Sequence, residues 1–190
     1  MYEVPPHLGG HENLTQFDEG AFDYLVSRFG IKSMVDVGCG PPGMVYYALS
    51  KGVAAVGVDG DPTVARGCPV VIEHDYTKGP LQIDEFDLGW AVEFVEHVEE
   101  QYIPNFMATF KCCKYVFITA AVPAQPGHHH VNCQWRDYWT AKFYEHGFAI
   151  HEEATAGVRQ HSNMWSRFTQ NTGLVFMRST ELIDGKAWRN

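Results

Sequence analysis

Short apolar runs alternate with amphipathic stretches along most of the chain. The apolar runs predict five strands, at 33–37, 53–58, 70–74, 86–91 and 114–119. The helical patterns predict helices at 18–29, 43–51, 103–110 and 136–146. Two later apolar runs, at 147–153 and 173–178, predict a closing hairpin whose connection is the polar stretch between them. This order is typical of an α/β fold with a mostly parallel sheet covered by helices.

The same pattern predicts a single domain. No internal repeat, low-complexity tract or linker divides the 190 residues, which are enough for one hydrophobic core. We expect residues 1–30 to form an N-terminal lid and helix, with Asp18 or Thr15 as the helix cap. Residues 31–190 are expected to form a Rossmann-like, doubly wound core.

Composition and charge narrow the classes of partner. The net charge is −9 and the 14 Lys and Arg residues form no cluster, which argues against a nucleic-acid partner. The five cysteines form no CxxC pair and favour reduced thiols in an intracellular protein. No apolar stretch approaches the ~20 residues of a membrane span, and no signal-peptide pattern is visible. We therefore expect a cytoplasmic protein with a small or neutral substrate.

A glycine turn joins the first predicted strand to the next helix. Residues 34–43 read MVDVGCGPPG, a GxGxxG match that also occurs in dinucleotide sites. Such sites hold a pyrophosphate on backbone N–H groups, but Pro41 and Pro42 supply none. The turn therefore favours a less anionic ligand. Asp36 lies inside the strand, where a buried carboxylate needs a partner, such as the turn itself or an ammonium group.

Carboxylates also follow the second and third predicted strands. Asp59, in GVDGDP, can accept hydrogen bonds from both hydroxyls of a ribose, a position shared with NAD-binding proteins. Asp75, in EHDYT, can accept a hydrogen bond from an amino group such as adenine N6. Because the carboxyl ends of parallel strands meet at one edge of the sheet, these residues are expected to line one crevice.

The segments VDVGCGPPG, GVDGDP and EHDYT resemble the successive cofactor motifs of class I S-adenosylmethionine-dependent methyltransferases. The resemblance extends through FDLGWAVEFVEHVEEQYIPNF and AAVPAQPGHHHVN to a compact subfamily of bacteria and large viruses or phages, similar to sugar O-methyltransferases. It implies a three-layer α/β/α fold with a seven-stranded, mostly parallel sheet and an antiparallel final strand. It also implies S-adenosyl-L-methionine as cofactor and, for a viral protein, a location in the host cytoplasm. The doubled proline at 41–42 departs from the usual turn of the family.

The resemblance assigns the cofactor to residues around these motifs. Those expected near the methionine moiety are Asp36, Gly38, Cys39 and Gly40. Those expected at the ribose are Asp59, Gly60 and Asp61, and those expected at the adenine are Asp75 and Tyr76. On one helical turn, Glu93 and His97 would face the cofactor together. The alternative is that 93–100 is a solvated acidic helix start.

Histidines after the fourth and fifth predicted strands are candidates for a general base. A hydroxyl acceptor loses its proton as it attacks the methyl carbon, and histidine is the commonest base near neutral pH. The catalytic candidates are His97, His129 and His130. The triple histidine at 128–130 has two alternative interpretations, a structural loop and a metal site. No metal is predicted, because adjacent loop side chains diverge and the sequence spacing offers no acidic or cysteine partner.

Further residues are predicted to contact the acceptor. A polar lid before the first helix supplies His11, Asn13 and Thr15, and the segment after the fifth strand supplies Asn132, Trp135 and Trp139. Amide groups and aromatic faces suit a polar ring such as a sugar. Because Tyr138 and Trp139 also have helical spacing, core packing is the alternative for either of them.

Together these features predict an O-methyltransferase that uses S-adenosyl-L-methionine. The expected acceptor is a hydroxyl on a sugar, a glycan or another small molecule, with a histidine as general base. Methylation of a nitrogen or of a protein side chain is the nearest alternative. A catalytically inert cofactor-binding module and a nicotinamide-dependent reductase are the other two.

Overall fold

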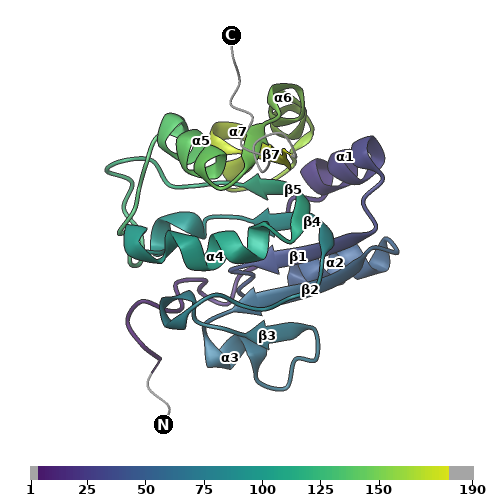
Figure 1. Cartoon of the computed structure of the whole chain (residues 1–190). Coiled ribbons are helices and arrows are strands. Elements are labelled where there is room, and N and C mark those ends of the chain that lie inside the picture. Colours follow the sequence, from purple (N-terminus) through teal and green to yellow (C-terminus); the bar gives the residue numbers. More distant parts are fainter. Residues whose placement is uncertain (1–3, 180–190) are drawn as a thin grey trace.

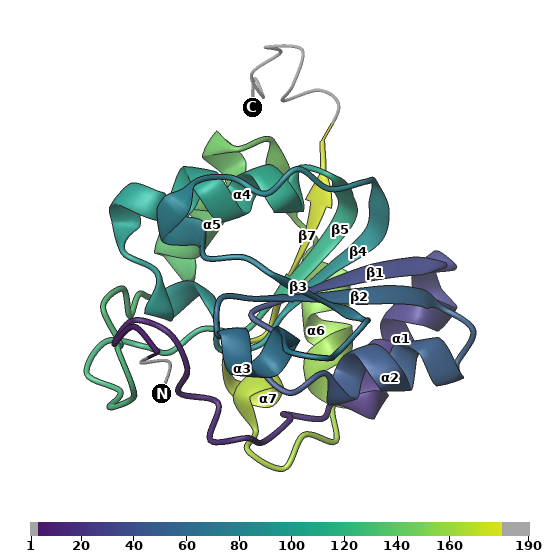
Figure 2. The ribbon, with the colours of Figure 1, turned by 90° about the horizontal axis from the view of Figure 1, so that it is seen from below.

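The computed structural model describes residues 4–179 and shows one sheet between two helical layers (Figures 1 and 2). Residues 1–3 and 180–190, the ends of the domain predicted over 1–190, lie outside the described residues. The seven strands have the order β3-β2-β1-β4-β5-β7-β6. They are β1 Ser33–Val37, β2 Ala54–Asp59, β3 Val71–Glu73, β4 Phe86–Ala91, β5 Cys113–Ile118, β6 Phe148–Ile150 and β7 Leu174–Arg178. Strand β7 is antiparallel to both of its neighbours, which confirms the predicted fold class.

The central strands are buried on both faces. Along β1, Met34 packs on one side of the sheet, whereas Val35 and Val37 pack on the other, as the alternation of side chains in a strand requires. Helices α1 Glu19–Phe29, α2 Gly43–Ser50 and α6 Glu152–His161 cover the first face. Helices α4 Ile103–Phe110 and α5 Arg136–Glu145 cover the second (Figure 2).

Most predicted elements agree with the structure to within one residue. The strands at 33–37 and 86–91 and the helix at 103–110 have the predicted bounds, and Asp18 caps α1 by accepting a hydrogen bond from the Ala21 N–H. Five short helical segments among the described residues were not among the predicted helices: α3 Pro62–Ala65, η1 Tyr76–Lys78, η2 Val95–His97, η3 Glu100–Tyr102 and α7 Phe168–Thr172.

The predicted closing hairpin is wrong in its connection. Strands β6 and β7 do pair, but β6 ends at Ile150, and the chain then forms α6 and α7 Phe168–Thr172 before β7. The His151 side chain accepts the Ala154 N–H at the start of α6. The buried face of α6 consists of small residues, and a Cβ at Gly157 would overlap the Tyr24 ring of α1. Residues 152–161 are polar on average although their apolar positions have helical spacing, and most of them fall in the polar stretch predicted as the hairpin connection.

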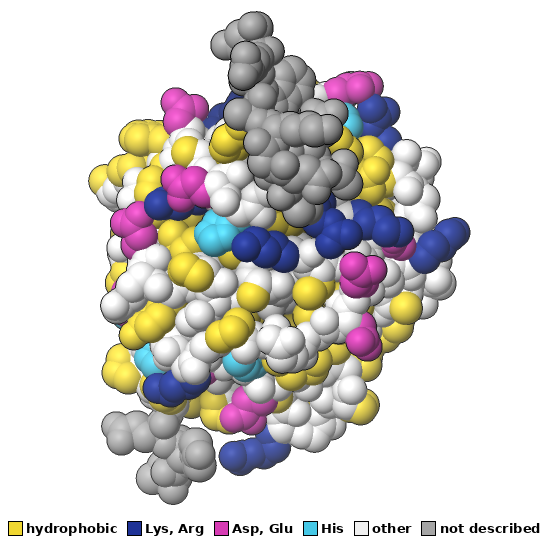
Figure 3. Space-filling view, in the orientation of Figure 1, with side chains coloured by type: hydrophobic (Ala, Val, Ile, Leu, Met, Phe, Trp, Pro, Cys, Tyr) yellow, Lys and Arg dark blue, Asp and Glu magenta, His cyan; other side chains and the backbone are white. Residues whose placement is uncertain are grey.

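The surface carries charges of both signs. On the face shown in Figure 3, Lys and Arg side chains lie among Asp, Glu and hydrophobic ones. Exposed ion pairs such as Lys114 Nζ–Asp87 Oδ1, at 2.7 Å, contribute to this mixture. Among the described residues, no helix has the length and apolar character that crossing a membrane requires.

Candidate functional site

A cavity of about 380 Å³ lies at the carboxyl ends of the central strands. Its walls come from the turn after β1, the ends of β2 and β3, the loops after β4 and β5, and the N-terminal segment 7–16. Ligands of open parallel sheets bind at this edge, where the strand order reverses on either side of β1. The volume lies within the ~300–1,000 Å³ typical of small-molecule sites.

The glycine turn after β1 presents its backbone to this cavity. Gly38 and Gly40 have φ angles of 70° and 49°, which glycine adopts without strain. The Gly38 N–H donates to the Val58 carbonyl at 2.8 Å, which ties the turn to β2. A Cβ at Gly38 would overlap the Phe94 ring, and one at Gly40 would lie 3.0 Å from the His11 Cβ. Glycine is therefore required where the turn meets the cavity wall.

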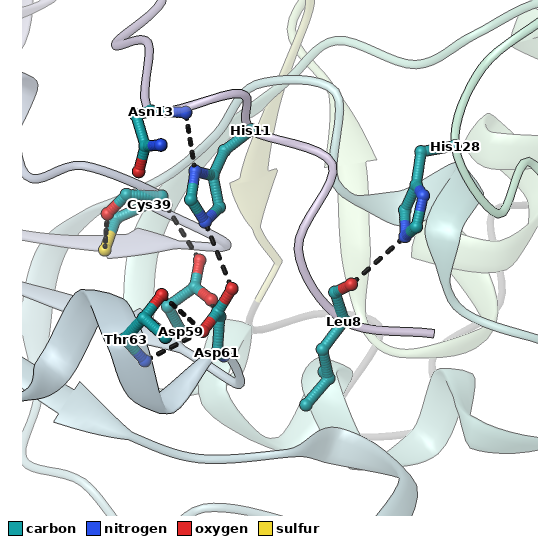
Figure 4. A network of polar contacts seen from close by, with 9 residues as sticks. Leu8, His11, Asn13, Cys39, Asp59, Asp61, Thr63 and His128 are labelled. Carbon is teal, nitrogen blue, oxygen red and sulfur yellow. Dashed lines mark hydrogen bonds and ion pairs between the residues drawn. The ribbon is translucent and has the colours of Figure 1, made fainter. Parts of the chain in front are cut away.

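Asp59, at the end of β2, orders both this turn and the next one. Its Oδ2 accepts the Gly40 N–H and its Oδ1 accepts the Asp61 N–H, each at 2.8 Å (Figure 4). Asp61 does not line the cavity; its Oδ1 instead accepts the N–H and O–H of Thr63 at the start of α3. Asp59 therefore lies on the wall of the predicted ribose pocket, and Asp61 lies behind it.

Residues 7–16, which we call the N-terminal strap, cross the mouth of the cavity. The His11 Nε2 donates to the Asp61 Oδ2 at 3.2 Å, because the His11 Nδ1 accepts the Asn13 N–H (Figure 4). The Thr15 hydroxyl donates to the Pro41 carbonyl at 2.8 Å. His11 and Thr15 line the cavity, as a lid would, whereas Asn13 does not.

Two histidines that were not predicted also hold the strap. The His7 Nε2 lies 3.1 Å from the Asp75 Oδ2, and the His128 Nε2 donates to the Leu8 carbonyl at 3.0 Å. His7 belongs to no recognisable motif, His128 is the first residue of the triple histidine, and their partners are 68 and 120 residues away. The strap is therefore fixed by contacts that sequence spacing does not reveal.

The cavity carboxyl groups differ in their protonation. Asp36 is 5% exposed, faces the cavity and receives no side-chain hydrogen bond from any described residue. Burial, reinforced by the charge of Asp59, raises the pKa of Asp36 to about 8. Burial alone would raise the pKa of Asp75, but hydrogen bonds from Thr77 and His7 hold it below its usual value. At neutral pH, Asp36 is therefore protonated. It lies with Asp59 and Asp75 at the end of the cavity that is predicted to bind the cofactor, which we call the cofactor end.

The loop after β4 places Glu93 and Glu96 at the opposite end of the cavity, which we call the acceptor end. Glu93 lines the cavity with a φ of 49°, and the Thr119 hydroxyl donates to its Oε1 at 2.8 Å. Glu96 is 0% exposed, and its Oε1 accepts the Ala121 N–H at 2.8 Å. Burial and the charge of the neighbouring Glu93 carboxyl raise the pKa of Glu96 well above its usual value.

Two histidines adjoin this acidic pair. His97 and His130 line the cavity with ring centroids 4.9 Å apart. The His130 Nδ1 donates to the Gln125 carbonyl at 2.9 Å, so Nε2 carries the lone pair of the neutral ring. Burial lowers the pKa of His97 to about 4 and keeps that ring neutral. Potential ligand atoms of Glu96, His97 and His130 all lie within 4.8 Å of one another.

This cluster corrects the expectation that no acid accompanies the triple histidine. The N–H groups of Val131 and Asn132 both donate to the Glu96 carbonyl, at 3.1 and 2.9 Å, and so bring the two loops together. Glu96 was grouped with the solvated acids of 93–100, but it is buried. A signal was present in the sequence, since the apolar Val95 and Val98 flank Glu96 and His97.

Several predicted acceptor residues lie away from the cavity wall. The His129 Nε2 lies 3.5 Å from the Glu99 Oε1, outside the cavity. Trp139 is 1% exposed in the core, whereas Trp135 is 61% exposed at the start of α5. Asn132 is buried and donates to the Val98 carbonyl. Of the three histidines predicted as bases, His97 and His130 remain on the wall.

The other predicted cofactor residues line the cavity. The set comprises Asp36, Gly38, Cys39, Gly40, Asp59, Gly60, Asp75, Tyr76 and Glu93. The Tyr76 hydroxyl lies 2.9 Å from the Thr109 hydroxyl, which fixes its ring between the end of β3 and α4. Burial raises the pKa of the Cys39 thiol, so this cysteine stays protonated and is no nucleophile.

No protein-family model matches the sequence, and no curated protein matches it. Solved structures do match the fold. A TehB-like SAM-dependent methyltransferase from Corynebacterium glutamicum has a TM-score of 0.61 at 14% identity, covering 84% of this chain and 88% of that chain. The methyltransferase domain of bacterial CtHen1 has a TM-score of 0.60 at 14% identity, covering 85% and 96%. Magnesium protoporphyrin IX methyltransferase from Synechocystis, with bound SAH, has a TM-score of 0.58 at 14% identity, covering 83% and 80%. The chain therefore has the fold of class I SAM-dependent methyltransferases.

Proposed function

We propose that this protein is an S-adenosylmethionine-dependent methyltransferase that acts on a hydroxyl group of a small polar acceptor, with a sugar or glycan as the first candidate. The observation that carries the proposal is the unpartnered carboxyl of Asp36 in a cavity with a glycine turn at one end and two histidines at the other. The fold shared with solved methyltransferases supports it.

The cofactor end fits a nucleoside joined to an amino acid. Asp36 offers a buried carboxyl without a hydrogen-bond donor, which is the group that an ammonium would satisfy. The backbone of Gly38 and Gly40 leaves room for close approach, because neither carries a Cβ. Asp59 keeps acceptor capacity for ribose hydroxyls beyond its two backbone partners, since each carboxylate oxygen has two lone pairs. Asp75 and Tyr76 line the wall where an adenine would lie.

The acceptor end fits a hydroxyl that must lose a proton. S-Adenosylmethionine, when bound, supplies an electrophilic methyl carbon on its sulfonium sulfur. An aliphatic hydroxyl becomes a useful nucleophile only as its proton is removed. The Nε2 of His130 is oriented by the hydrogen bond from its Nδ1 to Gln125, and this makes His130 the base in a metal-free site. The N-terminal strap crosses the mouth of the same cavity and is held there by His11 and Thr15.

The character of the cavity wall supports a small hydroxylated acceptor. Carboxyl and imidazole groups from Glu93, His97 and His130 offer several hydrogen-bonding positions beside apolar side chains such as Phe94 and Val98. The volume of about 380 Å³ must hold the cofactor as well as the reacting part of the acceptor. The aromatic residues predicted to stack on a sugar lie elsewhere, so the glycan assignment rests on these polar groups alone.

Calorimetry with S-adenosylhomocysteine and with NAD tests the cofactor. We expect the first to bind and the second not to bind; exclusive binding of NAD would contradict the proposal. Incubation with isotopically labelled S-adenosylmethionine and a panel of glycans, nucleosides, amines and proteins tests the acceptor. Label in a methyl ether supports the proposal, label on nitrogen would replace the hydroxyl acceptor, and no transfer to any compound would indicate an inert binding module.

A further inference from the structure

We infer that Glu96, His97 and His130, with Glu93 beside them, form a binding site for one divalent transition-metal ion at the acceptor end of the cavity. The three potential ligand atoms lie within 4.8 Å of one another. Ligands that bind one ion at ~2.0–2.2 Å are at most about 4.3 Å apart. Small side-chain rotations therefore suffice to close the cluster around an ion.

The second observation is an oxygen atom of Glu96 that lacks a donor. The Glu96 Oε2 is buried and accepts no hydrogen bond from a donor among the described residues. Glu96 interacts electrostatically with the neighbouring carboxyl of Glu93, which is half-buried on the cavity wall. Neighbouring carboxyl groups that are largely shielded from water favour a proton or a cation near them. The two imidazoles beside the pair are ligands for a cation.

The cluster is held in place by a surrounding layer of hydrogen bonds. The Gln125 carbonyl accepts the His130 Nδ1–H, which fixes the tautomer and directs the Nε2 lone pair. The Thr119 hydroxyl and the Gln125 side chain both donate to Glu93. Metal-binding histidines and carboxylates commonly have such supporting partners. The positive φ of Glu93 shows that the loop is constrained to bring this carboxyl to the cavity wall.

The donor set selects the class of ion. Two imidazole nitrogens with carboxylate oxygens suit Mn²⁺, Fe²⁺, Co²⁺ or Zn²⁺, whereas Mg²⁺ and Ca²⁺ prefer oxygen ligands alone. The three potential ligands contain no thiolate, which disfavours soft ions. Because Glu93, His97 and His130 line the cavity, open coordination positions of the ion would face the acceptor.

A metal ion here would add a way of activating the acceptor to the proposed function, and this part of the inference rests on that function. A divalent cation lowers the pKa of a hydroxyl that coordinates to it. The ion would then activate the acceptor hydroxyl, whose proton would pass to solvent as the oxygen attacks the methyl carbon, and His130 would act as a ligand of the ion instead of as a base. Metal binding itself does not depend on that role and is tested separately.

The test uses untagged full-length protein that has been stripped with a chelator and dialysed. Binding of Mn²⁺ is followed by the loss of the free-ion electron paramagnetic resonance signal, and binding of Zn²⁺ by calorimetry. We expect one strong site in the wild type. Because each loses a ligand, His97→Ala and His130→Ala should weaken it by more than about 100-fold, beyond the 10–100-fold typical of supporting residues. The matched control is His129→Ala, which removes the neighbouring imidazole that faces Glu99.

Three outcomes are decisive. Loss of the strong site in His97→Ala and His130→Ala, with binding retained in His129→Ala, supports the inference. Absence of a strong site in the wild type overturns it, as does equal binding by all three variants. Should either alanine variant fail to fold by circular dichroism, Glu96→Gln provides a near-isosteric replacement. Titration of each sample with S-adenosylhomocysteine separates the two proposals, because cofactor binding without metal binding would leave the proposed function standing.

Discussion

The two ends of the cavity are built in different ways. At the cofactor end, Asp59 accepts N–H groups of Gly40 and Asp61, from turns that directly follow β1 and β2. At the acceptor end, Glu96 and His130 come from loops 34 positions apart in the sequence and are held by backbone contacts between those loops. The first arrangement joins the ends of β1 and β2, which are consecutive in the chain and pair directly, and the second joins two loops that meet only once β4 and β5 are paired.

This difference has a functional consequence. The N–H groups of the glycine turn are already bound by Val58 and Asp59 of β2, so the cofactor end is largely preformed. The acceptor end contains the neighbouring carboxyl groups of Glu93 and Glu96, whose charge state depends on a proton or a cation near them. Changes at the cofactor end should therefore alter binding affinity, and changes at the acceptor end should alter turnover.

The largest expected effect is at the acceptor end. His130→Ala removes the imidazole that acts as base or as metal ligand, and we expect kcat to fall by about 10²–10⁴-fold, as is typical when a general base is removed. The affinity for S-adenosylhomocysteine should stay within about twofold, because the contacts around Asp36 and Asp59 do not involve His130. Steady-state kinetics and calorimetry on the same protein measure the two effects. A variant with full turnover would show that His130 has no part in the reaction.

The next effect is at the cofactor end. Asp59→Ala removes the acceptor of the Gly40 and Asp61 N–H groups as well as the proposed ribose contact. Hydrogen bonds to a charged group contribute ~1.5–3 kcal/mol each, so affinity for S-adenosylhomocysteine should fall by about 100-fold. Glu73→Ala is the matched control, since this exposed carboxylate ends β3 beside Asp59 but lies outside the cavity. Equal affinity in the two variants would show that the cofactor does not use this strand end.

The pH dependence of cofactor binding tests the role of Asp36, which belongs to the cofactor end alone. In the free protein Asp36 has a pKa of about 8 and is protonated at neutral pH. An ammonium group favours the carboxylate, so binding should release a proton below pH 8. Affinity for S-adenosylhomocysteine should then rise with pH by up to about tenfold per unit and level off near pH 8. Calorimetry in two buffers with different ionisation enthalpies counts the released protons.

Asp36→Asn is the control for that titration. The pKa of the folded state lies above that of the unfolded state, so ionisation of Asp36 destabilises the free protein as pH rises from about 4 to 8. The neutral amide lacks this penalty, so the variant should have a higher melting temperature at pH 8 but bind the cofactor more weakly. If its affinity keeps the same slope with pH, another group is responsible.

The local character of the cofactor end explains why the sequence revealed it. The order of strands and the positions of Asp36, Asp59 and Asp75 follow from motifs that are contiguous in the chain. Glu96 and His130 meet through tertiary contacts, and no spacing rule connects them. The apolar positions of α6 have helical spacing, but its polar average composition hid that pattern, so the helix was missed. Trp139 was predicted to contact the acceptor but lies in the core, because helical spacing does not distinguish a core aromatic residue from one in a pocket.

The smallest effect concerns the strap, which belongs to neither end but closes both. His11→Ala removes the hydrogen bond to Asp61 and the one from the exposed Asn13 N–H, and leaves the Thr15 contact with Pro41 intact. Only the bond to Asp61 ties the strap to another element, and one hydrogen bond contributes ~0.5–1.5 kcal/mol, so the dissociation rate of S-adenosylhomocysteine should rise about threefold to tenfold. Stopped-flow fluorescence with a competing ligand measures this rate. Because a lid slows release without contacting the reacting atoms, the chemical step in single-turnover experiments should not change. A slower chemical step with an unchanged dissociation rate would place His11 in the reaction itself.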